Sequence, residues 1–418
     1  MNIKKRKILY ITYHFPPSKK IGAIRARGFA KYLPAFGWDV IILTALLPDN
    51  PDCLFNIVET HPPYQKFLPY IFNPDLRERL KFMKGPFPNF FERIYSFFRG
   101  MIDIPDSRIG WLPFAVSVGK EIMKKERPQA IVSNFGPATC HIIASHLKKL
   151  NPNIFWLADF RDPWTQFRPD SFRTFIERHL EYQTLQVADA FSIVSDYLAN
   201  ALQKEFPNKP VYVIPNGFDP DEISPFTNPV TEKFIITHTG SLHPVYRSPE
   251  NFFKALANLI CSNRINKKDF LIQFYGDKQN WVIDLAKKFD ISDIVRYEGF
   301  KNREEILNHQ RTSQILLLFW RSGKGEEGTL TGKVFEYLAA RRPILSIGKR
   351  ATELVNLLYK TNAGIHCNNI DEMEKFLHAA YSQWQLHGFV KYMGIENEIT
   401  KYSHLEMARK FSEILNNV

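Results

Sequence analysis

The sequence is poor in cysteine, and the cysteines it has are scattered. Its 418 residues include four of them, with no C-x-x-C pair and no Cys/His spacing of the zinc-binding kind: Cys53, Cys140, Cys261 and Cys367. Zinc ribbons and disulfide-stapled domains use closely spaced cysteines, so both classes are excluded. A chain of this length buries a full core without such staples. We expect four buried, reduced thiols in the cytosol.

Long apolar runs are also missing. No stretch reaches 18 uninterrupted apolar residues, so no transmembrane helix is expected. The N-terminus, MNIKKRKILYITYHFPP, is basic and then apolar, but its apolar part ends at His14 and two prolines. That pattern is more typical of a buried first strand than of a signal peptide. We therefore expect a cytoplasmic protein.

Acidic residues are fewer than basic ones. The chain has 55 Lys and Arg against 43 Asp and Glu, a formal net charge of +12. Such an excess attracts nucleic acid, anionic lipid or phosphorylated ligands, and charge alone does not choose among them.

Short apolar runs alternate with helical patterns along the chain, which predicts an α/β fold of doubly wound parallel sheets. The runs have few polar interruptions, as strands do when helices cover both sheet faces. The predicted strands are Ile8–Thr12, Val40–Leu43, Ala130–Ser133, Ile154–Ala158, Phe191–Val194, Val211–Ile214, Phe234–His238, Leu271–Tyr275, Ile315–Phe319, Ile344–Ile347 and Gly364–His366. Helical patterns include Ala23–Phe36, Pro249–Cys261, Arg303–Gln310, Lys333–Ala340 and Asp371–Tyr381.

Eleven strands are too many for one ordinary sheet, so we expect two domains. The proline-rich segment Asp219–Glu232 has no apolar periodicity and is the best boundary. The expected domains are 1–220 and 230–400, with a C-terminal helix in 401–418 that packs back on the first. In such sheets ligands bind beyond the carboxyl ends of the strands, so site residues should follow strands.

One insertion, 62–105, departs from the alternation and is rich in aromatic and basic residues. Its part Asn89–Met101 spaces five apolar residues on one helical face: Phe90, Phe91, Ile94, Phe97 and Phe98. Either a helical hairpin packs these aromatics on the domain, or the segment touches lipid headgroups or a lipid-linked substrate.

Polar residues follow several strands of the first half. Gly22 lies in the loop that leads from the first strand into a helix, where a backbone approaches anions; a tight turn is the alternative. Arg161 and Asp162 follow the fourth predicted strand, and either form a polar site or an Arg–Asp pair that fixes the loop. His141 stands at a helix start, with a structural role as the alternative to a catalytic one. Asn216, in an Asn-Gly turn, either only turns the chain or meets substrate at a cleft mouth.

In the second half, small residues Gly240 and Ser241 follow a strand and let the backbone close on a ligand. Arg247 precedes a helix and can reach a phosphate; a solvated arginine is the alternative. The strongest cluster is Lys324–Leu338, a Gly/Thr loop between a strand and a helix. Its glycines do not have the spacing of a P-loop. Its backbone amides can still donate hydrogen bonds to a diphosphate, and a carboxylate in the helix can accept hydrogen bonds from ribose hydroxyls. A capped amphipathic helix with solvated glutamates is the alternative.

These motifs, in this order, resemble the GT-B glycosyltransferases, specifically glycosyltransferase family 4. The resemblance is carried by the FPP…G…R opening (Phe15 to Thr44), the ADFRDPW segment of a bacterial polysaccharide-type branch (Ala158 to Trp164), IPNGxD (Ile214 to Asp219), GSL (Gly240 to Leu242) and GKxFEYLAAxxPIL (Gly332 to Leu345).

The resemblance implies two Rossmann-like domains facing across a cleft, the first binding an acceptor and the second a nucleotide-sugar donor. It implies a retaining, metal-independent transfer with no cofactor, in cell-surface polysaccharide synthesis. Glu336 matches the ribose-binding glutamate, Gly22 the loop facing the diphosphate, and Arg247 a basic diphosphate ligand. The expected catalytic residues are Glu327, Asp162, Arg161 and His141. The expected donor-binding residues are Gly22, Asn216, Gly240, Ser241, Arg247, Thr331, Gly332, Lys333 and Glu336.

Three departures from the family pattern stand out. The usual arginine after the second-domain glycine is Ser241, and the usual lysine position is shifted, so that Arg247 is an inference. The family's paired glutamates have seven residues between them; eight places before Glu336 stands Gly328, and the nearest carboxylate is Glu327.

Two other functions stay open: a nucleotide-sugar epimerase and a non-catalytic nucleotide-sugar-binding scaffold. No metal site is expected, because the one Asp-x-Asp, Asp219-Pro220-Asp221, is interpreted as a solvated turn. The expected partners are the donor, a saccharide or lipid-linked acceptor and an anionic inner-membrane surface, with no nucleic acid. The basic run Lys4–Lys7 and the aromatic insertion motivate the peripheral membrane contact.

Overall fold

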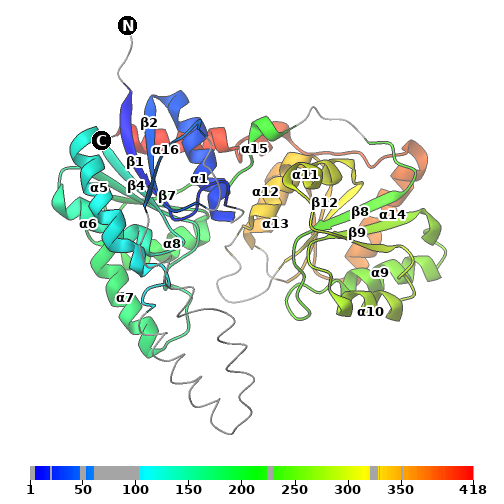
Figure 1. Ribbon diagram of the computed structural model, residues 1–418. Helices are drawn as coiled ribbons and strands as arrows, with labels where there is room; N and C mark the ends of the chain where they lie inside the picture. Colours follow the sequence, from blue (N-terminus) through cyan, green and yellow to red (C-terminus); the bar gives the residue numbers. More distant parts are fainter. Residues whose placement is uncertain are drawn as a thin grey trace. The chain divides into compact units, whose positions relative to one another are not determined.

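The computed structural model describes residues 5–18, 21–47, 53–60, 103–223, 229–320, 328, 330–349 and 352–417. The chain divides into two compact units, one of residues 1–214 with 408–418 and one of residues 215–407 (Figure 1). Each unit is built around its own parallel sheet.

The first unit has a sheet with strand order β3-β2-β1-β4-β5-β6-β7 among the described residues. Its strands are β1 (Arg6–Ile11), β2 (Trp38–Ala45), β3 (Asn56–Thr60), β4 (Ala130–Asn134), β5 (Phe155–Phe160), β6 (Ala190–Ile193) and β7 (Val211–Val213). Its helices are α1 (Ile21–Tyr32), α5 (Leu112–Glu126), α6 (Thr139–Leu150), α7 (Phe172–Leu185), α8 (Asp196–Glu205) and the end of α16 (His404–Asn416). The strand order reverses between β1 and β4, which pair in register from Ile8↔Ala130.

The second unit has the order β10-β9-β8-β11-β12-β13 in the part that the structure describes. Its strands are β8 (Phe234–Thr239), β9 (Phe270–Tyr275), β10 (Val295–Gly299), β11 (Ile315–Phe319), β12 (Ile344–Ile347) and β13 (Gly364–Cys367). Its helices are α9 (Glu250–Cys261), α10 (Asn280–Lys288), α11 (Arg303–Thr312), α12 (Gly332–Ala340), α13 (Thr352–Thr361), α14 (Ile370–His387) and α15 (Glu396–Thr400), with a short 3₁₀ helix η4 (Pro220–Glu222). Here the order reverses between β8 and β11. Ligands of doubly wound sheets bind at such reversals.

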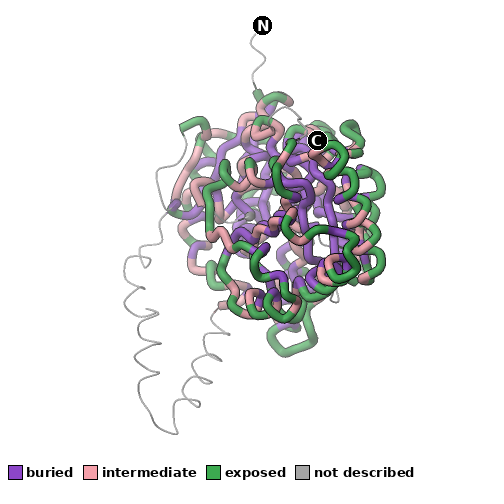
Figure 2. Tube along the Cα trace, turned by 90° about the vertical axis from the view of Figure 1, so that its right-hand side faces the viewer, coloured by how far each residue is buried: buried purple, intermediate pink, exposed green. Residues whose placement is uncertain are grey.

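The α/β prediction is confirmed, because all eleven predicted strands are present and all strand pairs are parallel. Residues buried in the sheets and on the helix faces against them form the cores (purple in Figure 2). Two edge strands, β3 and β10, escaped prediction. Their sequences, NIVET and VRYEG, interleave polar residues and are largely half-buried, so they lack the continuous apolar run of a central strand.

The end of the chain packs on the first unit through α16. The Phe411 ring meets Phe29 edge-on with centroids 4.9 Å apart, and Trp38 Nε1 donates to Asn416 Oδ1 at 3.1 Å. The aromatic insertion lies outside the described residues, apart from residues 103–105.

The cysteine expectation is wrong for two residues, because Cys53 and Cys261 are exposed, whereas Cys140 and Cys367 are buried. Within the described ranges, no helix has the length and apolar character needed to cross a membrane.

Candidate functional site

A buried ion pair joins the helix after β1 to the end of β5. Arg25 Nε and Nη2 donate to Asp159 Oδ2 and Oδ1 at 2.9 and 2.8 Å, and the two side chains are only 3% and 1% exposed. Asn134 Nδ2 and Ser192 Oγ donate to the same carboxylate, at 3.0 and 2.8 Å. Arg25 Nη2 also donates to the Ile214 carbonyl oxygen at 3.1 Å. Every charge here has partners, so this network holds four strand ends together and presents no free group to a ligand.

Arg161, a predicted site residue, pairs with its neighbour Asp162, as in the predicted alternative of an Arg–Asp pair. Arg161 Nε donates to Asp162 Oδ2 at 2.9 Å, and both side chains reach solvent. Its guanidinium lies against two glycines, Gly136 in the loop after β4 and Gly22, which is in the first turn of α1 and not in the loop expected from the sequence. A Cβ on Gly22 would come within 2.7 Å of Nη1, and one on Gly136, at φ +99°, within 3.1 Å of Nη2. The glycines thus make room for a cation at the reversal between β1 and β4.

His141 lies in the core instead of lining a surface. It is fully buried, its ring meets Phe160 at 4.5 Å between centroids, and Nδ1 lies 2.7 Å from Ser133 Oγ. Burial lowers the pKa of His141 to about 3 despite the charge of Asp159, so the ring is neutral at physiological pH. This location favours the structural alternative.

Asn216 falls at the start of the second unit, in a turn that the chain end fixes. Phe218 N donates to the Tyr402 carbonyl oxygen at 3.1 Å, and His404 N donates to that of Phe218 at 2.7 Å. A Cβ on Gly217 would stand 2.4 Å from Tyr402 O, which explains the glycine of the Asn-Gly turn.

The end of β8 meets the first turn of α12 at Gly240 and Lys333. Gly240 has φ +106°, and a Cβ there would lie 2.2 Å from Lys333 Nζ, so only glycine fits. Burial and then the positive charge of Arg247 lower the pKa of Lys333 to about 8, against the opposing effect of Glu336. Two neighbouring cations at a strand end suit an anion with more than one negative charge.

His238 lies in β8, two residues before Gly240, and was not predicted as a site residue from the sequence. Nδ1 lies 2.8 Å from the Leu317 carbonyl oxygen, while Nε2 is buried and has no hydrogen-bond partner among the described residues. Burial, with the charges of Lys333 and Arg247, lowers the pKa of His238 to about 3. A neutral ring beside these cations avoids adding a third positive charge.

Arg247 closes a short loop after β8. Its backbone N donates to the His243 carbonyl oxygen at 2.9 Å, and the His243 ring stacks on Tyr246 with centroids 4.8 Å apart. Ser241, at the start of this loop, is exposed.

The helix α12 begins at Gly332 after Thr331, whose side chain makes no capping hydrogen bond. Thr331 Oγ1 is buried and has no hydrogen-bond partner within the described part of the chain. The first amides of α12 are therefore not capped by this side chain, which favours an anion at this end. Glu327, the expected second glutamate, lies outside the described residues.

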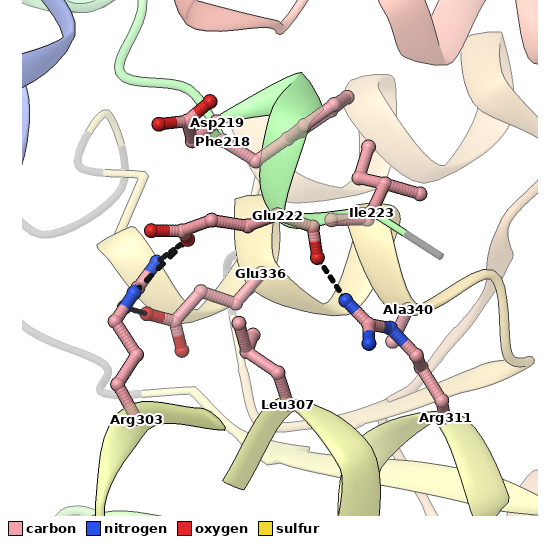
Figure 3. Close-up of a pocket in the computed structure, with 10 residues that line it drawn as sticks. Phe218, Asp219, Glu222, Ile223, Arg303, Leu307, Arg311, Glu336 and Ala340 are labelled. Carbon is pink, nitrogen blue, oxygen red and sulfur yellow. Dashed lines mark hydrogen bonds and ion pairs between the residues drawn. The ribbon is translucent and has the colours of Figure 1, made fainter. Parts of the chain in front are cut away.

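Glu336, one turn into α12, lines a pocket of the second unit (Figure 3). Its Oε1 accepts from Arg303 Nη1 at 2.9 Å, and the side chain is 22% exposed. Arg303 Nε and Nη2 donate to Glu222 Oε2 at 3.0 and 2.7 Å. Burial alone lowers the pKa of Arg303, but the hydrogen bond with Glu222 and the charge of Glu336 raise it overall. Neither Arg303 nor Glu222 was predicted as a site residue, because Arg303 lies 33 positions from Glu336 and 81 positions from Glu222 in the sequence.

The Asp-x-Asp turn also lies at this pocket. Asp219 caps η4 by accepting from Asp221 N at 3.1 Å and is buried, so the expectation of a solvated turn is wrong for Asp219. Asp221 is exposed. The described ranges contain no cluster of three or more His, Cys, Asp or Glu side chains with metal-site geometry.

Comparison with known proteins bears on the fold of the whole chain and on the family resemblance of one part of it. Residues 84–222 match the family described as Glycosyltransferase Family 4, and no curated protein sequence matches the chain. Sucrose-phosphate synthase from Thermosynechococcus elongatus has a TM-score of 0.62 at 14% identity, with 99% of each chain covered. HepE of Anabaena, in complex with UDP and glucose, has a TM-score of 0.61 at 12% identity, with 99% of this chain and 100% of HepE covered.

A third structure with this fold is the lipopolysaccharide outer core galactosyltransferase WaaB, in its apo form. Its TM-score is 0.60 at 12% identity, with 99% of this chain and 100% of WaaB covered. The GT-B fold is thus confirmed over nearly the whole chain, and the resemblance to glycosyltransferase family 4 over residues 84–222.

Proposed function

We propose that the protein is a glycosyltransferase that moves a sugar from a nucleotide-sugar donor to a saccharide or lipid-linked saccharide. The observation that carries the proposal is the group of Lys333, Arg247 and Glu336 around the start of α12, at the reversal of the second sheet. The family match and the HepE complex with UDP and glucose support a donor of this class. The WaaB likeness supports an acceptor in cell-surface polysaccharide synthesis.

In this proposal the bond from the anomeric carbon to the diphosphate breaks and its electron pair stays on the diphosphate oxygen. A bond to an acceptor hydroxyl oxygen forms, and the hydroxyl proton passes to a phosphate oxygen of the leaving diphosphate. Lys333, Arg247 and the first amides of α12 neutralise the charge that develops on the leaving diphosphate. Glu336 accepts hydrogen bonds from ribose hydroxyls. We assign acceptor binding to the first unit, with Arg161 and Asp162 beside Gly22 as its polar groups. The proposal further includes a hexosyl donor and retention of the anomeric configuration of the transferred sugar. NMR of the product, which shows the sugar and its anomeric configuration, tests both.

A thermal-shift screen against nucleoside diphosphates and their sugars tests donor binding. A ligand at about 100 times its dissociation constant stabilises the native state by roughly 2.7 kcal/mol. We expect the nucleoside diphosphate of one base to raise the unfolding temperature clearly more than the others do. No shift with any of them at millimolar concentration would contradict the proposal.

The charge state of Lys333 predicts how donor binding depends on pH. Since the pKa of Lys333 is lowered to about 8, its ammonium is present at pH 7 and is lost above pH 8. We expect nucleoside diphosphate affinity, measured by calorimetry, to be level up to about pH 7 and then to fall by up to about tenfold per pH unit. In Lys333→Met, affinity should be weak and level over the same range, whereas the exposed control Lys288→Met should keep the wild-type profile. A wild-type profile that stays level to pH 9.5 would refute this role.

Activity is expected to be independent of a divalent metal. The cations of Lys333 and Arg247 supply the positive charge that a magnesium ion gives the diphosphate in other enzymes. Turnover should therefore survive EDTA unchanged. Activity that EDTA abolishes and magnesium or manganese restores would show that this assignment is wrong.

We also propose that the protein binds an anionic membrane reversibly, on the basis of the +12 charge and the aromatic insertion. Basic residues near such a surface contribute about 1 kcal/mol each, and salt screens them. Co-sedimentation with vesicles should require anionic lipid, fall at high salt and weaken when Phe97 and Phe98 become serine. Equal recovery with neutral and anionic vesicles would assign the charge to the phosphate site alone.

A further inference from the structure

The pocket around Glu336 contains an arginine whose contacts explain how that carboxylate is held. Arg303 stands at the first position of α11, and Asn302 caps this helix by accepting from Glu305 N at 2.9 Å, while Glu305 Oε2 accepts from Asn302 N at 3.0 Å. This reciprocal cap fixes where α11 begins. Arg303 therefore leaves the helix from a defined place.

The guanidinium of Arg303 spans two carboxylates from different elements. Two of its nitrogens bind one oxygen of Glu222 on η4, and the third binds Glu336 Oε1 on α12 (Figure 3). A planar guanidinium keeps this geometry, whereas a lysine ammonium cannot reproduce it. Glu222 is held in turn, since its backbone oxygen accepts from Arg311.

The two carboxylate oxygens of Glu336 differ in their contacts with the described residues. Arg303 binds Oε1, and within the described residues no protein donor is found for Oε2. A carboxylate with one oxygen anchored and the other open is prepared to accept from a ligand hydroxyl, and an anchored rotamer loses less entropy on binding.

We propose that Arg303, braced by Glu222, is a positioning residue that aims Glu336 at the ribose hydroxyls of the donor, so that this chain's preference for ribonucleotides over deoxyribonucleotides depends on the Glu222–Arg303 pair. The proposal rests on the proposed function, in which Glu336 receives the ribose. Arg303 acts through Glu336 and does not itself contact the donor.

The test compares two ligands that differ only in the ribose hydroxyls. The nucleoside diphosphate of the base that gives the largest thermal shift and its 2′,3′-dideoxy analogue are titrated by calorimetry into wild type, Arg303→Gln, Glu222→Gln, Glu336→Gln and the double variant Arg303→Gln/Glu336→Gln. The matched control is Arg264→Gln, because Arg264 is also ion-paired, to Glu374, and is 42% exposed, against 40% for Arg303. Thermal unfolding confirms that each variant is folded.

Wild type should bind the ribonucleotide about tenfold or more tighter than the dideoxy analogue, because a charge-assisted hydrogen bond contributes that much to affinity. The ratio of these two affinities is the quantity compared among the variants. Arg303→Gln and Glu222→Gln should cut this ratio several-fold by weakening the ribonucleotide alone, and Arg264→Gln should leave it unchanged. The double variant should lower the ratio of the two affinities no further than Glu336→Gln alone does. Arg303→Lys, which keeps the charge, should be intermediate.

Two negative outcomes are distinguishable. A ratio that Glu336→Gln abolishes but Arg303→Gln and Glu222→Gln leave at the wild-type value overturns the positioning role and keeps the proposed function. A ratio near one in wild type, or one that Glu336→Gln does not change, overturns the ribose role of Glu336 and this inference with it. Equal losses for both ligands in Arg303→Gln would mean a general structural role, which also overturns the proposal.

Discussion

Replacing Glu336 by glutamine is expected to weaken binding of the nucleotide-sugar donor by at least about tenfold. The carboxylate lies at the start of α12 with one oxygen bound by Arg303, and an amide removes the charge that strengthens its bonds to ligand hydroxyls. Loss of such a hydrogen bond costs about 1.5–3 kcal/mol. Calorimetry with the donor, and with an acceptor once one is identified, measures the two affinities separately, and the acceptor should bind nearly as well as before.

The matched control for this variant is Glu250→Gln. Glu250 also lies on a helix of the second unit and pairs with a basic residue, Lys288 at 3.0 Å, but it lines no part of the pocket. Donor affinity should be unchanged in this control. If Glu336→Gln binds the donor as tightly as the control does, the ribose role is wrong.

Asp159→Asn is expected to lower the free energy of unfolding by about 3–5 kcal/mol, since it leaves the buried Arg25 without its counter-charge. The amide also meets Asn134 and Ser192, which donate to the present carboxylate. Urea denaturation followed by circular dichroism measures the loss. The control Asp170→Asn removes an 88% exposed carboxylate paired with Arg178 and should cost less than about 1 kcal/mol. A loss for Asp159→Asn no larger than for this control would mean that the network contributes nothing to stability.

The sheets were predictable because strands covered on both faces leave continuous apolar runs, such as Ile315–Phe319. The edge strands β3 and β10 were not predictable, because their interleaved polar residues leave no continuous apolar run. For the DFRD segment, the predicted alternative of an Arg–Asp pair is present between Arg161 and Asp162. The partner of Asp159 was not predicted: it is Arg25, 134 residues away, because the fold places the helix that follows β1 near the end of β5.

The candidate site was predictable in part for the same reason. The Gly/Thr loop before Gly332 and the glycine at position 240 are local patterns, and the structure brings Gly240 and Lys333 into contact. His238, Arg303 and Glu222 carry no local pattern, since their importance comes only from what the fold places beside them. His141 shows the converse: its place at a helix start suggested a site, while the packing of Phe160 and Ser133 puts it in the core.

The most direct test of a glycosyltransferase is to identify its products. The protein is incubated with each nucleotide sugar and a lipid extract of a bacterial cell envelope, and the mixture is examined by mass spectrometry and by chromatography that separates sugar isomers. We expect one donor to yield free nucleoside diphosphate and an acceptor heavier by one sugar residue, with both products lost in Lys333→Met. An isomerised nucleotide sugar would identify an epimerase instead, and a donor that binds but is returned unchanged would identify a scaffold; either result would contradict the account.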